Sequence, residues 1–411
     1  MANSVDRVAL WNIVATVDAF LSSGFTPTEL MRWVHPSLVA STQGTGMGGM
    51  TSMQTMYHGN LLGRNKPNDI LQEALPNVIA AHVVGIGALV LSREGARVVS
   101  TDLSERATQF ARFNCALNQR DNVEVMSSDL YTAVEGQTFD CIVAHLPWIT
   151  EVGGGVHDAY AAGESLVKRV VAGLTETLRP GGVRFALTQG RDTKEGKFED
   201  RVRAWLKDQA DEFDILFGYY QVLTSQEILK TIARRDRTSG PEAMARLESE
   251  FEQAGLSEML FGGLYIRRHN GRSREPWTVR RKLSDATRGA DVMSALILHD
   301  WLSGPESVVR ILASTPLLAP GLQITSSQVV QDAALVPGKF IFETNKPFVA
   351  RDSFDPWTAR MLARFDAKTT VAKVVEDAQA DATIPDSARQ EEFVALVAHA
   401  LAAGYLNLPD D

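Results

Sequence analysis

The sequence predicts an α/β protein with a mainly parallel central sheet, a helical N-terminal region and a small C-terminal domain. Strand and helix signals alternate along residues 76–270, and this alternation is typical of a parallel sheet crossed over by helices. Helical periodicity without strand signals precedes this stretch, and two strand signals followed by three helical ones come after it. The length of 411 residues fits two or three domains at about 150 residues each.

The composition favours a globular protein whose partners are small molecules or other proteins. Hydrophobic residues make up 45% of the chain and charged residues 22%, which are ordinary values. The formal net charge of −9 disfavours nucleic acid, because binding a phosphate backbone requires a basic surface. The N-terminus lacks a basic signal-peptide start and no eighteen apolar residues run unbroken, so we expect a cytoplasmic protein without membrane segments. Cys115 and Cys141 lie in apolar patterns, which predicts reduced thiols in the core.

Residues 1–75 are expected to form a helical N-terminal region. Apolar residues recur at helical spacing between residues 5 and 40, and Thr26 followed by Pro27 is a typical helix start. The glycine-rich stretch 41–54 interrupts this pattern and indicates a loop. No Lys-Ser/Thr pair follows the glycines, so the stretch is a weak candidate for a phosphate-binding loop.

The α/β region 76–270 is predicted element by element from these alternating signals. The strands and helices together predict a parallel sheet that closes with an antiparallel hairpin. The helix that ends near residue 178 is expected to stop at the LRPGG sequence, because proline and glycine end helices. The predicted strands are 97–102, 122–129, 139–145, 183–189, 213–223 and 259–268, and the predicted helices start after Ser104 and cover 165–178, 198–209 and part of 224–254.

A polar, basic segment, residues 267–282, predicts a surface linker, and the alternative is a docking patch for an acidic partner. We therefore divide the rest of the chain into a linker and helix (271–320) and a C-terminal domain (321–411). The order of two strands and three helices in this domain suits a winged-helix-like fold. Its predicted strands are 327–335 and 339–345, and its predicted helices are 356–365, 370–378 and 386–403, the last ending at Gly404.

Candidate binding residues follow the ends of three predicted strands, where parallel sheets bind ligands. Asp102 ends the first strand and offers two oxygens to a ribose diol. Asp129 follows the second strand and suits an exocyclic amine, with Leu130 as an apolar wall beside the ring; the alternative is a helix-capping role for Asp129. The third strand runs into the tetrapeptide His145-Leu146-Pro147-Trp148, whose histidine and tryptophan have the ordinary alternatives of a backbone cap and a core residue.

This order of two strand-end acids and a strand-end Pro-aromatic turn resembles the class I S-adenosylmethionine (SAM) methyltransferases. It is most similar to the methyltransferase small domain group, which carries an Asn-Pro-Pro-Tyr/Phe tetrapeptide. The helix after Asp102, the SDLY sequence at 128–131 and LRPGG at 178–182 are also similar, over residues 78–267 in all. The resemblance implies a Rossmann-like methyltransferase sheet for 76–270 and SAM as cofactor. The residues that it implies for the nucleoside are Asp102, Leu103, Asp129 and Leu130.

The chain departs from the family pattern at two places. The family's acidic, glycine-rich first turn is reduced here to Gly85 and Gly87, which the resemblance implies on the methionine side of SAM. In the tetrapeptide, His145 replaces the asparagine, whereas Pro147 and Trp148 keep the turn and the aromatic ring. An imidazole can accept a proton from a hydroxyl or amine nucleophile, so a general base is the predicted role of His145.

The sequence therefore predicts a SAM-dependent methyltransferase that acts on nitrogen, oxygen or sulfur of a small-molecule acceptor, in the context of specialised metabolism. One alternative is a catalytically silent methyltransferase-like protein that binds a protein or peptide, suggested by the reduced glycine turn. Another is an N-methyltransferase of nucleic acid or protein, suggested by the winged-helix-like C-terminal domain. The eight histidines have no metal-ligand spacing, so no metal is expected, and a homodimer is left open.

Overall fold

The computed structural model describes most of residues 87–409, and the predicted N-terminal helical region (1–75) lies outside this part. The chain divides into two compact units, Met1–Glu135 and Gly136–Asp411, which are described separately. Within 87–409 the undescribed positions are 96, 146–155, 236–244, 246–247, 250, 254, 272–273, 382 and 385–388.

The described part of the first unit contains a parallel strand pair connected by a helix. Strand β1 (Val98–Asp102) pairs in parallel with β2 (Val123–Ser127), and helix α6 (Glu105–Leu117) connects them. The Ser104 side chain accepts a hydrogen bond from the Ala107 N–H at 3.3 Å, so it caps α6 as the sequence predicted. One helix face, at i, i+4 and i+8, is buried: Ala107, Ala111 and Cys115.

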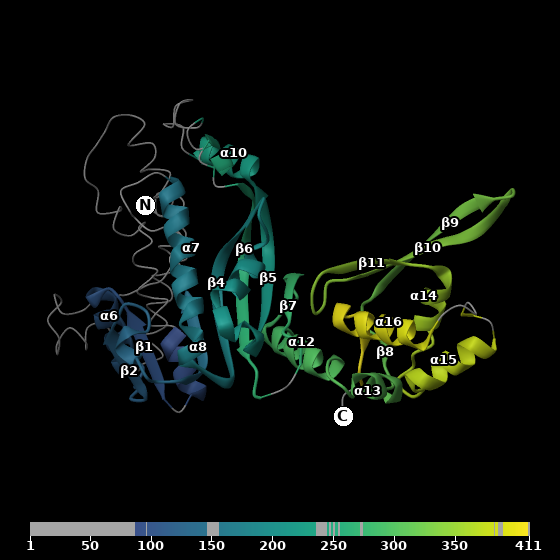
Figure 1. Cartoon of the computed structure of the whole chain (residues 1–411), viewed down its shortest axis with the longest axis horizontal. Helices are drawn as coiled ribbons and strands as arrows, with labels where there is room; N and C mark the ends of the chain where they lie inside the picture. The colour runs from purple at the N-terminus through teal and green to yellow at the C-terminus, as the bar shows by residue number, and fades with distance from the viewer. Residues whose placement is uncertain are drawn as a thin grey trace, which may run out of the picture. The chain divides into compact units, whose positions relative to one another are not determined.

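A five-stranded mixed sheet forms the centre of the second unit (Figure 1). Its order is β3-β4-β6-β5-β7, with β3 parallel to β4, β7 parallel to β5, and β6 antiparallel to both β4 and β5. The predicted antiparallel hairpin is therefore confirmed, and its second strand inserts into the sheet instead of extending its edge. The strands are β3 (Phe139–His145), β4 (Leu178–Thr193), β5 (Phe213–Thr224), β6 (Leu256–Arg268) and β7 (Thr278–Lys282).

Helix α9 packs closely against the sheet through the aromatic ring of Phe198. Phe198, the first residue of α9, lies against Gly190 of β4, where a Cβ atom would come within 2.6 Å of the phenyl ring. Glycine at position 190 therefore allows α9 to contact β4, β5 and β7 closely. The helical elements before the C-terminal part are η3 (Thr132–Val134), α7 (Val156–Ala172), α8 (Leu174–Thr177), α9 (Phe198–Trp205), η4 (Lys207–Glu212) and α10 (Ser225–Arg235).

The prediction that a helix ends at LRPGG is confirmed, but these residues already belong to a strand. Helix α7 ends at Ala172, the one-turn helix α8 ends at Thr177, and β4 begins at Leu178, so the proline and both glycines lie inside a strand. Leu178 pairs with Phe139 and Val183 pairs with Cys141, so four residues of β4 bulge out between two pairs that are almost adjacent on β3. A bulge tolerates proline and a positive φ of 81° at Gly181, which is why these residues can lie within β4.

The expectation of a solvated linker over 267–282 is also wrong. Arg267 and Arg268 are the last residues of β6, and residues 278–282 form the edge strand β7. The Ile215 N–H of β5 donates to the Trp277 carbonyl at 2.7 Å. The segment is therefore part of the sheet, and the reason is a buried acid that its arginines neutralise.

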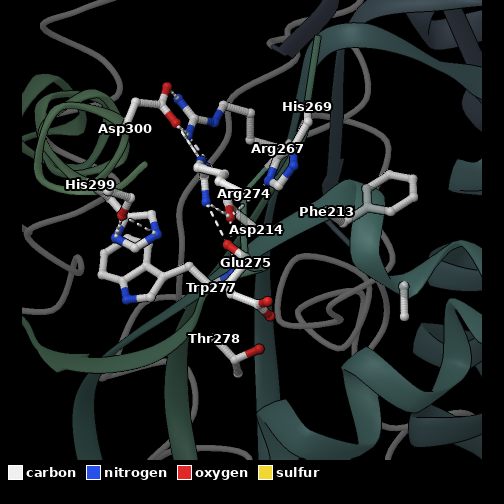
Figure 2. A network of polar contacts seen from close by, with 12 residues as sticks. Phe213, Asp214, Arg267, His269, Arg274, Glu275, Trp277, Thr278, His299 and Asp300 are labelled. Atoms are coloured by element: carbon white, nitrogen blue, oxygen red, sulfur yellow. Dashed lines mark hydrogen bonds and ion pairs between the residues drawn. The ribbon is translucent and has the colours of Figure 1, made fainter. Parts of the chain in front are cut away.

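Asp214 on β5 is fully buried, and basic side chains surround its carboxylate (Figure 2). An Arg267 Nη2–H donates to Oδ2 at 2.7 Å, and the Arg274 guanidinium donates to both carboxylate oxygens. His269 Nε2 lies 2.9 Å from Oδ1, to which the Trp277 N–H also donates at 3.1 Å. Burial alone would raise the pKa of Asp214, but hydrogen bonds from the two arginines and the histidine outweigh it and hold the pKa well below its usual range.

The same two arginines reach helix α12 (Gly289–Leu302) through Asp300. Arg267 donates two hydrogen bonds to the Asp300 carboxylate at 2.8 and 2.9 Å, and the Arg274 Nε–H donates a third at 2.9 Å. His299 stacks on Trp277 with ring centroids 4.3 Å apart, and burial and the nearby arginines lower its pKa to about 4. The network therefore ties β5, the end of β6, the 274–277 segment and α12 together.

The C-terminal part has its own core and contacts the sheet. Phe348 packs in one buried cluster with Leu216 of β5 and Val292 of α12, and the Val349 N–H donates to the Lys282 carbonyl at 2.9 Å. The three predicted helices are present, and Gly404 (φ 80°) ends the last one. The predicted strand 327–335 is wrong, because the chain turns at Asp332 and Ala333 and β10 already begins at Ala334. The elements are α13 (Ser307–Ala313), β8 (Leu317–Leu318), β9 (Gln323–Gln331), β10 (Ala334–Thr344), β11 (Ala350–Phe354), α14 (Pro356–Leu362), α15 (Val371–Ala380), α16 (Gln390–Ala403) and β12 (Leu406–Asn407).

We predict that Asp214→Ala lowers the free energy of unfolding by about 3–5 kcal/mol, because it removes the fully buried one of the two acids that neutralise Arg267 and Arg274. The matched control is Asp140→Ala, which removes an acid from an exposed pair with Arg179 and should cost about 1 kcal/mol or less. Urea unfolding of both variants measures the difference. Equal losses would contradict a central role for Asp214.

Candidate functional site

The carboxyl ends of β1 and β2 form the candidate site of the first unit. Asp102 and Ser127 are Cα partners and the last residues of their strands. The Ser128 N–H donates to the Asp102 carbonyl at 2.9 Å, so backbone pairing of the two strands continues to their carboxyl ends. Asp129 follows directly, and the two predicted acids therefore lie at the same edge of one parallel strand pair, where such sheets bind ligands.

One of the two oxygens of the Asp102 carboxylate is hydrogen-bonded within the protein. Its Oδ1 accepts a hydrogen bond from the Ser104 N–H at 2.7 Å, which fixes the orientation of the side chain at the start of α6. Within the described part of the chain, Oδ2 accepts no hydrogen bond, so it is available to a hydroxyl group. Leu103 beside it is 75% exposed, which is unusual for a large apolar side chain and provides apolar surface next to the acid.

The turn after β2 holds Asp129 and Leu130 in one conformation. Leu130 has a φ of 53°, in the left-handed region that costs a non-glycine residue roughly 1 kcal/mol or more. The buried Ser128 hydroxyl donates to the Leu130 carbonyl and accepts from the Ala133 N–H, both at 3.0 Å. The Thr132 hydroxyl donates to the Asp129 carbonyl at 2.8 Å. Side-chain hydrogen bonds therefore stabilise a strained turn, and Ser128 is a positioning residue that the sequence analysis missed.

The glycine positions are only partly described. Gly85 lies outside the described residues, and Gly87 is the first described residue of a helical stretch that runs to residue 94. A Cβ atom at Gly87 would meet nothing within 4 Å, so no described neighbour requires glycine at this position.

The tetrapeptide begins at the end of β3, in the second unit. His145 is the last residue of β3 and pairs with Leu187 of β4, whereas Leu146, Pro147 and Trp148 lie outside the described residues. Leu187 is 42% exposed, and Val143 of β3 is 45% exposed. The backbone of His145 is therefore at a strand end with exposed apolar neighbours.

The described acids with lowered pKa values that lie in ion-pair networks are in the second unit, away from Asp102 and Asp129. Arg280 of β7 binds Asp192 at 2.7 Å and also contacts Glu199, and the hydrogen bonds from Arg280 lower the pKa of Asp192 against the opposing effect of burial. Like the Asp214 network, these acids are neutralised within the protein. Among the described residues no cluster of three or more His, Cys, Asp or Glu side chains could hold a metal ion. None of the helices described here combines the length and apolar character that crossing a membrane requires.

Residues 70–204 match the family model of the methyltransferase small domain. This segment belongs to that family. Its β1–α6–β2 unit, β3 and the first half of β4 are the elements on which the sequence resemblance rested. The cofactor of the family is S-adenosylmethionine, and the Asp102 carboxylate and the fixed Asp129–Leu130 turn are compatible with its nucleoside.

Curated relatives match over short segments. Fatty acid synthase subunit alpha from Candida parapsilosis is 40% identical over 94 residues, which are 23% of this chain and 5% of that protein. The Saccharomyces cerevisiae subunit is 31% identical over 142 residues, 34% of this chain and 7% of that protein. The chain thus spans a small fraction of the length of these relatives.

Solved methyltransferase structures show a weak overall similarity. A geranyl diphosphate C-methyltransferase from Streptomyces coelicolor A3(2) is 13% identical with a TM-score of 0.27, covering 45% of this chain and 67% of that one. A ribosomal protein L11 methylase from Lactobacillus delbrueckii subsp. bulgaricus is 16% identical with a TM-score of 0.26, covering 46% and 67%. Scores this low carry no inference about substrate.

We predict that Ser128→Ala lowers the free energy of unfolding by about 1–2 kcal/mol and weakens SAM binding several-fold, because the two hydrogen bonds that hold the Leu130 turn are lost. Ser127→Ala makes the same chemical change at an exposed neighbouring position and should alter neither quantity. Thermal unfolding and calorimetric titration with SAM measure both effects. A destabilised Ser128→Ala protein with unchanged SAM affinity would limit Ser128 to a structural role.

Proposed function

We propose that this protein is a SAM-dependent methyltransferase that methylates nitrogen, oxygen or sulfur of a small molecule. The observation that carries the proposal is the edge of β1 and β2, where an acid with one available oxygen and a fixed acid–leucine turn lie together in a methyltransferase small domain. Two acids at this edge suit the two polar groups of a nucleoside, the ribose diol and the exocyclic amine.

Each of these residues has a distinct role in the proposed site. Asp102 accepts hydrogen bonds from the ribose hydroxyls, and Asp129 accepts one from the exocyclic amine of the base. Leu103 and Leu130 provide apolar contacts to the base. Gly85 and Gly87 line the methionine side. The bound cofactor supplies a methyl group on a sulfonium, and the protein has to align the acceptor with it.

His145, Pro147 and Trp148 are proposed to bind the acceptor. A neutral imidazole at the end of β3 takes the proton that an oxygen or nitrogen nucleophile loses on methylation. Pro147 fixes the turn, and Trp148 forms a wall of the acceptor site. The exposed Val143 and Leu187 beside His145 support an apolar acceptor of moderate size.

The C-terminal part supports a small molecule over nucleic acid as substrate. We assign residues 321–411 to a winged-helix-like domain, residues 271–320 to its connection, 76–270 to the catalytic domain and 1–75 to a helical N-terminal region, all in a cytoplasmic protein. In a winged-helix reader the hairpin carries basic residues toward phosphates, but the nine residues of β9 include no lysine or arginine. The net charge of −9 also disfavours nucleic acid as the substrate.

We predict that Asp102→Ala weakens SAM binding by about 1.5–3 kcal/mol, or roughly 10- to 150-fold, because charge-assisted hydrogen bonds to the ribose are lost. Asp121→Ala removes an exposed acid near the opposite end of β2 and should leave the affinity unchanged. Calorimetry of wild type and both variants is the measurement. Absence of binding by the wild type would favour the catalytically silent alternative, and equal affinity of all three proteins would remove Asp102 from the ribose site.

For His145→Asn we expect kcat to fall by about 10²–10⁴ while SAM affinity changes little, because the amide preserves the turn but cannot take a proton. The wild-type rate should rise with pH within about pH 5–8, where histidine loses its charge, and the variant should lose this dependence. The measurement is kcat against pH with the methyl acceptor. A sulfur acceptor has no proton to lose, so a flat profile and a near-normal variant rate would exclude His145 as general base.

A further inference from the structure

The hairpin of β9 and β10 exposes a free strand edge. In the three-stranded sheet β11-β10-β9, strand β9 lies at one edge, and all nine of its residues are exposed. Asp332 and Ala333 close the hairpin with φ values of 50° and 60°, which is the geometry of a tight two-residue turn. Figure 1 shows the hairpin extending beyond the helices of the C-terminal part.

This edge lacks the usual protection against pairing. Edge strands commonly carry lysine, other charges or proline, which prevent a second strand from adding to them. Strand β9 has none of these residues, and the proline of the hairpin, Pro337, is in the inner strand β10. Val330 and Leu335 face each other across the hairpin and are 73% and 67% exposed. The hairpin therefore offers unpaired backbone groups with apolar side chains beside them.

The sequence of β9 is complementary to itself when two copies run antiparallel. With Ser327 at the centre, each residue faces one of similar kind, and the β-branched residues Ile324 and Thr325 face Val330 and Val329. A shift of two residues would place Ile324 opposite Gln328, so a single register is favoured. The matched pairs are Gln323–Gln331, Ile324–Val330, Thr325–Val329, Ser326–Gln328 and Ser327–Ser327.

We propose that β9 pairs with β9 of a second copy of this chain, antiparallel and centred on Ser327. A two-fold axis requires such self-complementarity, because each contact is made twice. The seam contains no charge, so no like charges meet although each chain carries a net charge of −9. The two hairpin sheets then form one continuous six-stranded sheet. This inference does not depend on methyl transfer.

The length of the strand indicates how strong the dimer should be. Nine residues at about 3.4 Å each give a seam of roughly 30 Å. A contact made by one strand of each chain buries less surface than the interface of a permanent dimer. The dimer should therefore dissociate on dilution, with a dissociation constant in the micromolar range.

The test is sedimentation velocity of the full chain at low- and high-micromolar concentrations. Two double variants form a matched pair. Ile324→Lys with Val330→Lys puts lysine opposite lysine at both outer pairs and should give a monomer. Ile324→Lys with Val330→Glu puts lysine opposite glutamate and should keep the dimer. Both variants introduce two charges into the same hairpin, so a general effect on folding would be equal in the two.

Three results would overturn the proposal. A wild type that stays monomeric at the highest concentration excludes a second copy, even if the edge binds another protein. A dimer that survives the double-lysine change uses another surface. Two monomeric double variants exclude the register.

Disulfide crosslinking is a second test of the register. It requires a Cys141→Ser background, because Cys141 is exposed and not in the core as the sequence predicted, whereas Cys115 is buried. Ser327→Cys should crosslink under mild oxidation, since the two residues 327 meet at the axis, whereas Thr325→Cys should not. Equal crosslinking at both positions contradicts pairing centred on Ser327.

Discussion

The buried carboxylate of Asp214 determines how the second unit is assembled. A charge with no exposed surface has to be neutralised locally, because transfer of an unpaired charge out of water costs several kcal/mol. Arg267 and Arg274 neutralise it and also bind Asp300 of α12. As a result the segment after β6 returns to the sheet as edge strand β7, and α12 follows beside it. The C-terminal part then meets β5 and α12 through Phe348.

The edge of β1 and β2 shows a different principle, in which backbone geometry prepares a site. A parallel pair brings two strand ends together, and Ser104 and Ser128 then fix the residues that follow. Leu130 keeps a strained conformation because hydrogen bonds on both sides stabilise it. Strain held in this way is common at ligand sites, where a rigid surface reduces the ordering needed on binding. We propose that the nucleoside of SAM binds at these strand ends.

The proposals about the two ends of the second unit rest on different properties. At β3 the deciding property is chemical, since a histidine at a strand end can accept a proton where an asparagine cannot. At the β9–β10 hairpin the deciding property is geometric, since a neutral and self-complementary edge pairs best with itself. Neither depends on the other, so a dimer without catalysis and catalysis without a dimer are both measurable outcomes.

The sequence alone determined the local elements: the alternation of strands and helices, the Ser104 cap, the Gly404 helix end and the place of Asp102 and Asp129 at strand ends. These follow from interactions between residues close in the chain. Only the tertiary structure decided that residues 267–282 join the sheet. Arg274 binds Asp214 and Asp300, which are 60 and 26 residues away in the sequence. A run of arginines without acidic partners nearby in the sequence predicts a solvated linker instead. Likewise, the bulge at LRPGG depends on pairing with β3, which no local pattern contains.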